Sequence, residues 1–412
     1  MRLIADLHIH SKYSRATSKQ MDISHIAEFA KYKGIDIVGT GDFTHPLWLT
    51  NLKKELKEDG SGFLTFQKEK VRFVLTAEIS GIFKQGGKTR KIHTLLIVPD
   101  LLTAEKIHNQ LAKLGANLHS DGRPIIGLSA KDLAQIVFDI NPKSLVIPAH
   151  AWTPWFSIFG SKSGFDSINE CYEELSNNIY AIETGLSSDP QMNWRLSSLD
   201  NITLISNSDA HSPQNLGREA NFFKLKTLAY QDMAEAIKTK NNKQLLYTIE
   251  FYPEEGMYHF DGHRNCKFVV NPFEKQYHND LCPICHKPLT IGVANRIGKL
   301  ADRTEGKKLL NFPDFKKIVP LREIIAESFE VGKQSKRVEA EYFNIVQNIA
   351  PEFEILLELS TQELYKQLQP EIAKAIIQVR QGNMFIEPGY DGVYGKVKIF
   401  DHKNASTQGS LF

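Results

Sequence analysis

Short apolar runs in the first 211 residues end, one after another, on acidic residues or histidines. The run ends are DLHIH (6–10), GTGDFTH (39–45), LTAEIS (75–80), IPAHAW (147–152), AIETGLSSD (181–189) and SNSDAH (206–211). The runs are rich in Val, Ile and Leu, as strands buried on both faces are, and amphipathic helical patterns separate most of them. This alternation predicts an α/β fold with a parallel sheet or barrel.

The polar residues at these run ends form the candidate active site. Carboxyl ends of parallel barrel strands share one rim, and a Gly-rich hairpin over 78–96 would return His93 to the side of Glu78. The residues expected to converge are His8, His10, Asp42, Glu78, His93, His150, Asp209 and His211. The pair His8 and His10 alone is equally consistent with hydrogen-bonded histidines. Several buried carboxylates, however, require cations nearby.

The number of candidate ligands exceeds the four that a single zinc ion takes, so we expect two or three metal ions, with Glu78 bridging a pair. His45 and Glu183 are either partners that support the ligands or surface residues. Clustered metal ions generate a hydroxide and stabilise a phosphoryl centre during in-line displacement. The residues therefore predict a metal-dependent phosphoesterase, with Zn²⁺, Mg²⁺ or Mn²⁺ in the barrel site.

Composition narrows the class of protein. The chain has 412 residues, 42% hydrophobic and 24% charged, which suits two to three globular domains. A net charge of +2 gives no overall basic field, although a local basic groove stays open as an alternative. No apolar run reaches about 18 residues, and the start MRLIADLHIH lacks a signal-peptide pattern. Four cysteines, three of them clustered, favour a reducing compartment, so we expect a cytoplasmic protein.

A second metal site is predicted within residues 259–293. The pattern H-x2-C-x15-C-x2-C is formed by His263, Cys266, Cys282 and Cys285. Both knuckle spacings suit tetrahedral zinc, and a site with four protein ligands is structural; chance pairing of cysteines is the alternative. His278 and His286 are other candidates for the fourth ligand, but the spacing to Cys266 favours His263. Cys171 is expected to be a buried helix residue.

Two further regions bear on the substrate. The His150 run end is followed by Trp152, Trp155, Phe156 and Phe159, which form an aromatic lid packed on the barrel, a platform that stacks an extruded base, or both. Helical patterns rich in Lys and Arg continue to about residue 380, as a solvated face or as a grip on the DNA backbone. A hairpin with Gly turns over 386–400 closes this module.

The end of the chain carries a short candidate binding motif. Residues 403–410 are polar and small, so we expect a flexible tail, and Leu411 and Phe412 then form an apolar pair. The spacing Gln408-x-x-Leu411-Phe412 resembles the short peptides by which repair and replication proteins hold a sliding clamp. The alternative is a chance match or a simple packing tail.

The ordered motifs resemble the PHP (polymerase and histidinol phosphatase) superfamily. The resemblance covers about residues 1–240: His-x-His, an acid after the second run, a Glu, two single histidines and a final Asp-x-His. It implies a distorted seven-stranded (β/α) barrel, followed here by a small zinc finger and a mainly helical module. It also implies that metals are shared by His8, His10, Glu78 and Asp209, that Glu78 bridges to His93 and His150, and that Asp42 and His211 serve a third position.

Four longer stretches are similar to the endonuclease Q family, and the similarity runs over nearly the whole chain. They are PAHAWTPWFSIFGSKSGFDSI, IETGLSSDP, SNSDAHSP and CPICHKPLTIGV. The similarity implies nicking of DNA on the 5′ side of deaminated bases (uracil, hypoxanthine, xanthine) or abasic sites, with Glu78 and Asp189 tied to activity. The expected domains are a barrel over 1–245, a finger over 255–300, a DNA-binding helical module over 301–397 and a tail over 398–412.

Two other functions compete with this interpretation. A small-molecule PHP phosphatase needs neither a finger nor an aromatic loop, so these segments argue against it. A non-catalytic DNA-binding barrel would not keep a nearly complete set of metal ligands.

Overall fold

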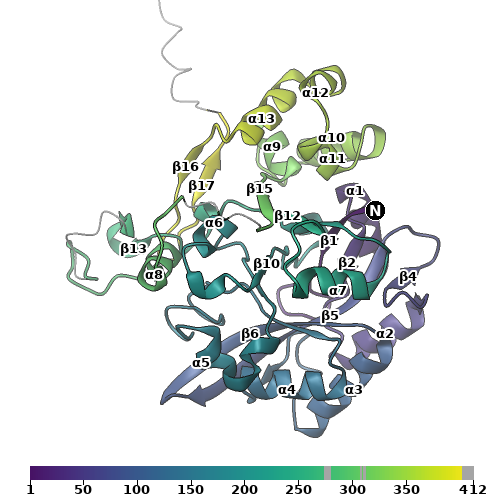
Figure 1. Ribbon diagram of the computed structural model, residues 1–412. Helices are drawn as coiled ribbons and strands as arrows, with labels where there is room; N and C mark the ends of the chain where they lie inside the picture. The colour runs from purple at the N-terminus through teal and green to yellow at the C-terminus, as the bar shows by residue number, and fades with distance from the viewer. Residues whose placement is uncertain (273–279, 307–308, 310–311, 401–412) are drawn as a thin grey trace, which may run out of the picture.

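The computed structural model describes residues 1–272, 280–306, 309 and 312–400, and its larger part is a distorted barrel (Figure 1). The barrel strands are β1 (Arg2–Asp6), β2 (Ile37–Gly39), β5 (Arg72–Gln85), β6 (Lys88–Val98), β8 (Leu145–Pro148), β9 (Ala181–Glu183) and β10 (Thr203–Ile205). Every one of them contributes to a single buried apolar cluster that includes Leu3, Ile37, Val74, Leu95, Ile147, Ala181 and Ile205. The predicted α/β barrel is confirmed.

All barrel strands except β6 run in one direction. β1, β2 and β5 pair parallel, β9 and β10 pair parallel, and β6 is antiparallel to both β5 and β8. β6 is reversed because the turn at Gly86 and Gly87, both at positive φ, folds it back on β5, as the Gly-rich segment predicted. Backbone and side-chain contacts close the ring, such as Ala151 N to Glu183 O at 2.9 Å and Leu7 N to Asn207 Oδ1 at 2.8 Å.

Helices surround the barrel. They are α1 (Ile23–Lys33), α2 (Pro46–Glu55), α3 (Leu101–Lys113), α4 (Ala130–Ile140), α5 (Ile168–Tyr172), α6 (Pro190–Asn193) and α7 (Tyr230–Lys238). The Ser129 hydroxyl accepts a hydrogen bond at the start of α4, and Gly34 ends α1 at φ 81°. Cys171 is buried in α5, as predicted. Short 3-10 helices occur at Glu173–Asn178, Ser197–Leu199, Pro213–Asn215, Pro253–Glu255 and Arg264–Cys266.

The sheet continues beyond the barrel. β11 (Ala220–Lys224) pairs antiparallel with β1, β12 (Leu245–Glu250) pairs with β11, and β15 (Asp314–Lys317) pairs parallel with β12. β4 (Leu64–Phe66) and β7 (Ile125–Ile126) pair with β5, and β3 (Leu56–Glu58) pairs with β4. One continuous sheet therefore includes β11, before the predicted division at residue 245, and β15, after it. The domain boundaries stay a prediction.

The finger segment and the C-terminal hairpin lie side by side (Figure 1). The finger contains β13 (Asp261–His263), β14 (Phe268–Val270) and α8 (Val293–Leu300), and the hairpin consists of β16 (Phe385–Glu387) and β17 (Lys396–Lys398). The Phe260 amide donates to the Gly389 carbonyl at 2.9 Å, and the Arg264 amide donates to Asp391 Oδ2 at 2.7 Å. The predicted hairpin is therefore present, and it packs on the finger.

The C-terminal helices form a small bundle that docks on α1. They are α9 (Leu321–Ser328), α10 (Lys336–Asn348), α11 (Glu352–Leu357), α12 (Thr361–Gln367) and α13 (Pro370–Gln381). Lys33 Nζ lies 2.7 Å from Glu352 Oε2, and both side chains are buried. Tyr342 Oη donates to the same carboxylate at 2.9 Å, so the pair is hydrogen-bonded and fixes the docking. Within the part of the chain that the structure describes, no helix is both long and apolar enough to cross a membrane.

Candidate metal centres and their surroundings

The first cluster joins side chains from three distant parts of the chain. His8 and His10 follow β1, Glu78 lies in β5, and Asp209 follows β10; one ligand atom from each lies within 4.8 Å of the others. His10 Nε2 is 3.2 Å from Glu78 Oε2 and 3.1 Å from Asp209 Oδ1. His8 Nε2 is 3.7 Å and 3.8 Å from the same two oxygens.

The second cluster uses the other oxygen of the same glutamate. Glu78 Oε1 lies 2.7 Å from His93 Nδ1 and 3.0 Å from His150 Nε2. The β5–β6 hairpin produces this contact, because its register sets His93 opposite Ser80, two residues beyond Glu78. Glu78 therefore belongs to both clusters, one oxygen to each, which is the arrangement of a bridging carboxylate.

Both clusters fit metal ions. His8 Nε2, His10 Nε2 and Asp209 Oδ1 are buried, face one another and have no hydrogen-bond partner among the residues that the structure describes. Leaving such atoms unsatisfied is costly unless a cation joins them. His150 and Asp209 also hold positive φ, at 30° and 48°, a backbone strain that is typical of functional sites.

Two buried carboxylates contact the Nδ1 atoms of His8 and His10, on the side of each ring away from the cluster. Both oxygens of Glu183 lie 2.9–3.0 Å from His8 Nδ1, and Asp42 Oδ1 lies 3.0 Å from His10 Nδ1. Because a carboxylate accepts, each Nδ1 carries a proton, which leaves Nε2 as the atom that binds a metal ion once its own proton is displaced. Glu183 also accepts from the His150 amide at 2.9 Å, so it contacts residues of both clusters. Glu183 is thus a supporting partner, one of the two alternatives that the sequence left open.

Asp42 occupies a different position from the predicted one. Its second oxygen accepts hydrogen bonds from the Ser11 amide and hydroxyl and from the Ser14 hydroxyl, at 2.6–2.9 Å. It therefore orients His10 from outside the cluster. The His211 ring lies 4.4 Å from the His10 ring and borders the first cluster; its role as a ligand stays a prediction. His45 is buried and stacks on Tyr13 at 4.5 Å, neither on the surface nor in a cluster.

The electrostatics of the first cluster call for positive charge. Burial opposes charge on His8 and His10, but Glu183 and Asp42 respectively outweigh it and raise both pKa values well above 6.5. Burial also opposes ionisation of Glu78, yet His93 and Arg123 hold its pKa well below the usual range. In the second cluster, burial lowers the pKa of His93 to about 4, so its imidazole is neutral and able to bind a metal ion.

Asp189 lies apart from both clusters. Its Oδ1 accepts from the Met192 amide at the start of α6, and its Oδ2 lies 2.8 Å from Lys317 Nζ. Asp189, Glu254, His259 and Lys317 line a cavity of about 120 Å³. The similarity to the endonuclease Q family tied Asp189 to activity, and this role stays a prediction.

The finger residues converge as their spacing predicted. One atom each from His263, Cys266, Cys282 and Cys285 lies within 4.8 Å of the others. His263 Nδ1 is 3.4 Å from Cys285 Sγ, whereas His286 is not part of this group. His278 lies outside the described residues. Although burial opposes it, hydrogen bonds from the Cys285 and Ile284 amides lower the pKa of Cys282 to about 7, which favours the thiolate that zinc binds.

The aromatic loop is divided between the core and the surface. Trp152 is 1% exposed, and its ring lies 4.7 Å from that of Phe159, which is also buried. Its indole N–H donates to Asn193 Oδ1 at 2.7 Å. This burial contradicts the predicted stacking of Trp152 on a base. Trp155 is 40% exposed and meets the Tyr258 ring edge-to-face at 5.5 Å. Phe156 lies 4.8 Å from the His93 ring, beside the second cluster. Trp155 is exposed and Phe156 is half-buried, and base binding by these two residues stays a prediction.

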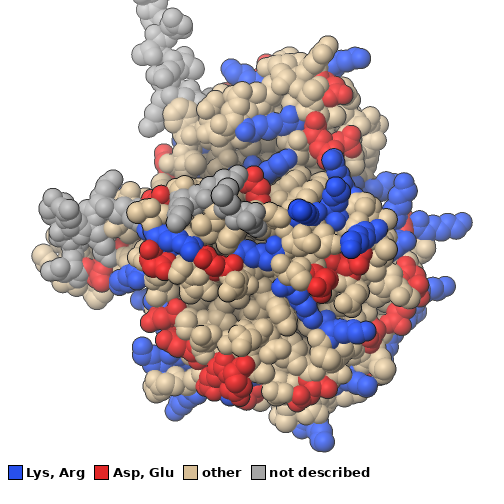
Figure 2. Space-filling model, viewed as in Figure 1, with Lys and Arg blue, Asp and Glu red and all other residues tan. Residues whose placement is uncertain are grey.

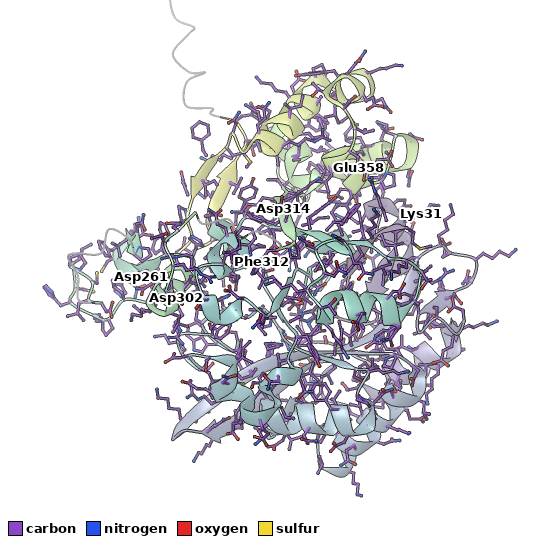
Figure 3. All side chains as sticks on the ribbon, viewed as in Figure 1. Lys31, Asp261, Asp302, Phe312, Asp314 and Glu358 are labelled. Atoms are coloured by element: carbon purple, nitrogen blue, oxygen red, sulfur yellow. The ribbon has the colours of Figure 1, made fainter. Side chains whose placement is uncertain are left out.

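The finger is attached to this loop. From α8, the Arg296 guanidinium donates to the carbonyls of Phe159 and Phe165, each at 2.9 Å. A second contact forms just after α8 (Figure 3), where the Asp302 carboxylate accepts from the Ser197 amide at 2.8 Å. The finger is therefore held against the barrel near the rim that carries His150.

Many of the charged residues on the face drawn in Figure 2 lie where the barrel meets the C-terminal helices. Figure 2 shows Lys and Arg gathered in a band between the barrel and the C-terminal helices, interspersed with Asp and Glu. This mixture leaves both interpretations of the basic segments open, a solvated face or a backbone grip. Gln408, Leu411 and Phe412 lie outside the described residues.

Arg123 is the residue that sequence reasoning missed. Its Nη1 lies 3.0 Å from Glu78 Oε2. It sits in the loop SDGRP, after no apolar run of its own, so the pattern of strand ends did not reveal it. The pairing of β7 with β5, together with contacts between its loop and the segment after β1, brings it to the rim.

The barrel and its two histidine–carboxylate clusters define a protein of the PHP class. The chain is 32% identical to the lesion-specific endonuclease PfuEndoQ of Pyrococcus furiosus, whose crystal structure matches with a TM-score of 0.86 over 99% of this chain and 98% of that one. An endonuclease Q in complex with a 27-mer duplex substrate with an abasic lesion at the active site is 33% identical, with a TM-score of 0.85 over 97% of each chain. The chain belongs to the endonuclease Q family.

The C-terminal helices match a family model of their own. The model of the MJ0043 C-terminal domain matches residues 320–383, which contain α9 to α13. The uncharacterized protein MJ0043 of Methanocaldococcus jannaschii is 32% identical over 260 residues, 62% of this chain. The match spans about a third (32%) of that relative's length.

Proposed function

We propose that the protein is a metal-dependent DNA repair endonuclease that hydrolyses the phosphodiester 5′ of a deaminated base or an abasic site. The observation that carries this proposal is the shared Glu78, whose two oxygens face two adjacent ligand clusters. Paired metal sites of this kind suit phosphodiester hydrolysis. Membership of the endonuclease Q family supports the choice of damaged DNA as the substrate.

We assign the ligand roles as follows. His8, His10, Glu78 and Asp209 hold one metal ion, and Glu78, His93 and His150 hold another. Zn²⁺, Mg²⁺ and Mn²⁺ are the candidate ions, and when bound they supply Lewis acidity and an activated water. Glu183 and Asp42 keep the ligand tautomers and ring orientations fixed before metal arrives.

The remaining modules would serve DNA binding. His263, Cys266, Cys282 and Cys285 hold a structural Zn²⁺, because four protein ligands leave no open position. Asp189 contributes to activity from its own cavity, where Lys317 and His259 accompany it, through substrate binding. Trp155 and Phe156 contact the damaged nucleotide, and the helical module grips the backbone.

The C-terminal motif supports a second proposal about partners. Gln408, Leu411 and Phe412 would bind a sliding clamp through an apolar pocket. Removing residues 408–412 should leave nicking of short DNA intact and abolish clamp binding in calorimetry. A truncated protein that binds the clamp as tightly as the full chain would contradict this partner.

The main proposal is tested by mapping the cut. A labelled duplex with one deoxyuridine, and a matched duplex with thymidine, are incubated with the protein and a divalent metal ion. We expect a single nick immediately 5′ of the uracil, lost on chelation and restored by added metal. Hydrolysis of a small phosphomonoester without any nicking would support the phosphatase alternative, and binding without either reaction would support the non-catalytic one.

A further inference from the structure

Arg123 places a positive charge beside the carboxylate that both clusters share. Its Nη1 is 3.0 Å from Glu78 Oε2, and 27% of the side chain is exposed. It lies two residues before β7, which pairs with β5 at Ser80 and Ile125. The Ser80 amide also donates to the Pro124 carbonyl at 3.0 Å, so the loop is attached to β5 just beyond Glu78.

The other side of the loop is attached to the segment after β1. The Gly122 amide donates to the Tyr13 carbonyl at 3.0 Å, and a Cβ at Gly122 would collide with the Asp42 carboxylate and the Ser14 hydroxyl. Asp121 Oδ1 accepts from the amides of Arg123 and Arg15, at 3.1 Å and 3.2 Å. The backbone of Arg123 is therefore fixed from both sides of the rim, and only a residue without a side chain fits before it.

The ion pair with Glu78 accounts for only one edge of the Arg123 guanidinium. Arginine has no lone pair, so it cannot bind a metal ion. Among the described residues its guanidinium makes one hydrogen bond, to Glu78, which leaves most of its N–H donors for another partner. Glu78 offsets part of the repulsion between this guanidinium and divalent ions at the neighbouring ligands, and an anionic substrate group would offset more of it.

We propose that Arg123 binds a non-bridging oxygen of the scissile phosphodiester, next to the metal ions that Glu78 bridges. A guanidinium presents several donors in one plane, so one edge can contact Glu78 while the other contacts phosphate. Negative charge on the phosphoryl oxygens must be stabilised most strongly as the bond to the leaving oxygen breaks. This inference rests on the proposed function, because it names a further contact to the same substrate.

The kinetic test compares Arg123→Met and Arg123→Lys with Arg15→Met. Arg15 contacts the same Asp121, at 3.5 Å, but its side chain is 76% exposed, so it is the matched control. We expect Arg123→Met to lower kcat by about 100-fold or more, and Arg123→Lys to lower it less. The metal content of both variants, measured by mass spectrometry, should equal that of the wild type, and Arg15→Met should retain its kcat.

The binding test needs no turnover. Nicked duplexes are prepared with a 5′-phosphate or a 5′-hydroxyl on the damaged nucleotide, and affinity is measured by fluorescence anisotropy. The wild type and Arg15→Met should prefer the phosphate by about tenfold, the worth of a hydrogen bond to a charged group, and Arg123→Met should lose this preference.

The outcomes separate the two proposals. A wild type that nicks no damaged DNA contradicts the proposed function. A wild type that nicks, beside an Arg123→Met variant that keeps both the rate and the phosphate preference, contradicts the role of Arg123 alone. Loss of barrel metal in Arg123→Met would instead assign Arg123 to holding Glu78, and would also overturn the inference.

Discussion

The barrel clusters and the finger cluster use similar side chains but are built in opposite ways. The barrel ligands come from strand ends as far apart as His8 and Asp209, and the fold holds them with Glu183 and Asp42. The finger ligands all lie within 263–285, and three of the four are partly exposed. The comparison predicts that the fold assembles the barrel site before metal binds, whereas the finger would depend on metal for its own structure.

The largest effect should come from Glu78→Ala, which removes a ligand from both barrel sites at once. We expect nicking to fall by about 1,000-fold or more, because both metal ions contribute to the transition state, while the fold is kept. The control is Glu250→Gln, since Glu250 is equally buried but outside the clusters, and burial raises its pKa to about 8. Nicking by Glu78→Ala at the wild-type rate would contradict the assignment of Glu78 to both barrel metal sites.

Glu183→Gln should weaken metal binding in the barrel and leave the finger unchanged. The amide cannot accept from His8 Nδ1, Asn207 Nδ2 and the His150 amide together, so ligands of both clusters lose support. We expect barrel affinity to fall by about 10- to 100-fold in calorimetric titrations. The finger zinc, counted in the same sample, is the internal control, and equal losses at both sites would contradict a local role.

Cys282→Ser should have the opposite effect to Glu183→Gln, because it should remove the finger zinc and leave metal binding in the barrel unchanged. We expect the loss of one zinc per chain, a lower melting temperature and weaker binding of damaged DNA, because the finger buries little apolar surface of its own. Cys171→Ala removes the buried thiol of α5 and should keep the zinc content. If Cys282→Ser keeps its zinc and its melting temperature, the finger assignment is wrong.

The smallest effect is a pH dependence of the metal-free protein. In the folded state the pKa values of His8 and His10 are well above 6.5, because the effect of burial is outweighed by the charges of Glu183 and Asp42. Burial raises the pKa of Glu250 to about 8. The folded state therefore binds more protons than the unfolded state, and these contributions are lost as pH rises through the folded pKa values. In chelator, melting temperature should fall from about pH 6.5 to about pH 9. A rise over this interval would contradict the charge balance of the first cluster.

The two metal centres also differ in how far the sequence predicts them. The finger ligands follow from spacing alone, because all four are local in the chain. The barrel ligands His8, Glu78 and Asp209 follow from strand ends, because parallel strands share a rim. The hairpin adds His93, since its register is set by the turn at Gly86 and Gly87.

Side-chain direction beyond the strand ends could not be predicted. Asp42 turns back toward His10 and the serines at positive φ. Arg123 reaches the rim through the pairing of β7 with β5 and through contacts of its loop with the segment after β1. Trp152 and Trp155 are three residues apart in one loop, yet only the contacts of Trp152 with Phe159 and Asn193 decide which of the two is buried. Such contacts depend on the tertiary fold, which has no local signal in the sequence.

The central claim is that Glu78 bridges two metal sites while the finger holds a third. Anomalous scattering from crystals grown with Zn²⁺ or Mn²⁺ locates each ion directly. We expect two peaks on either side of Glu78, one beside His8, His10 and Asp209 and one beside His93 and His150, and a separate peak among the finger cysteines. Crystals with a filled finger but no peak beside Glu78 would contradict the account.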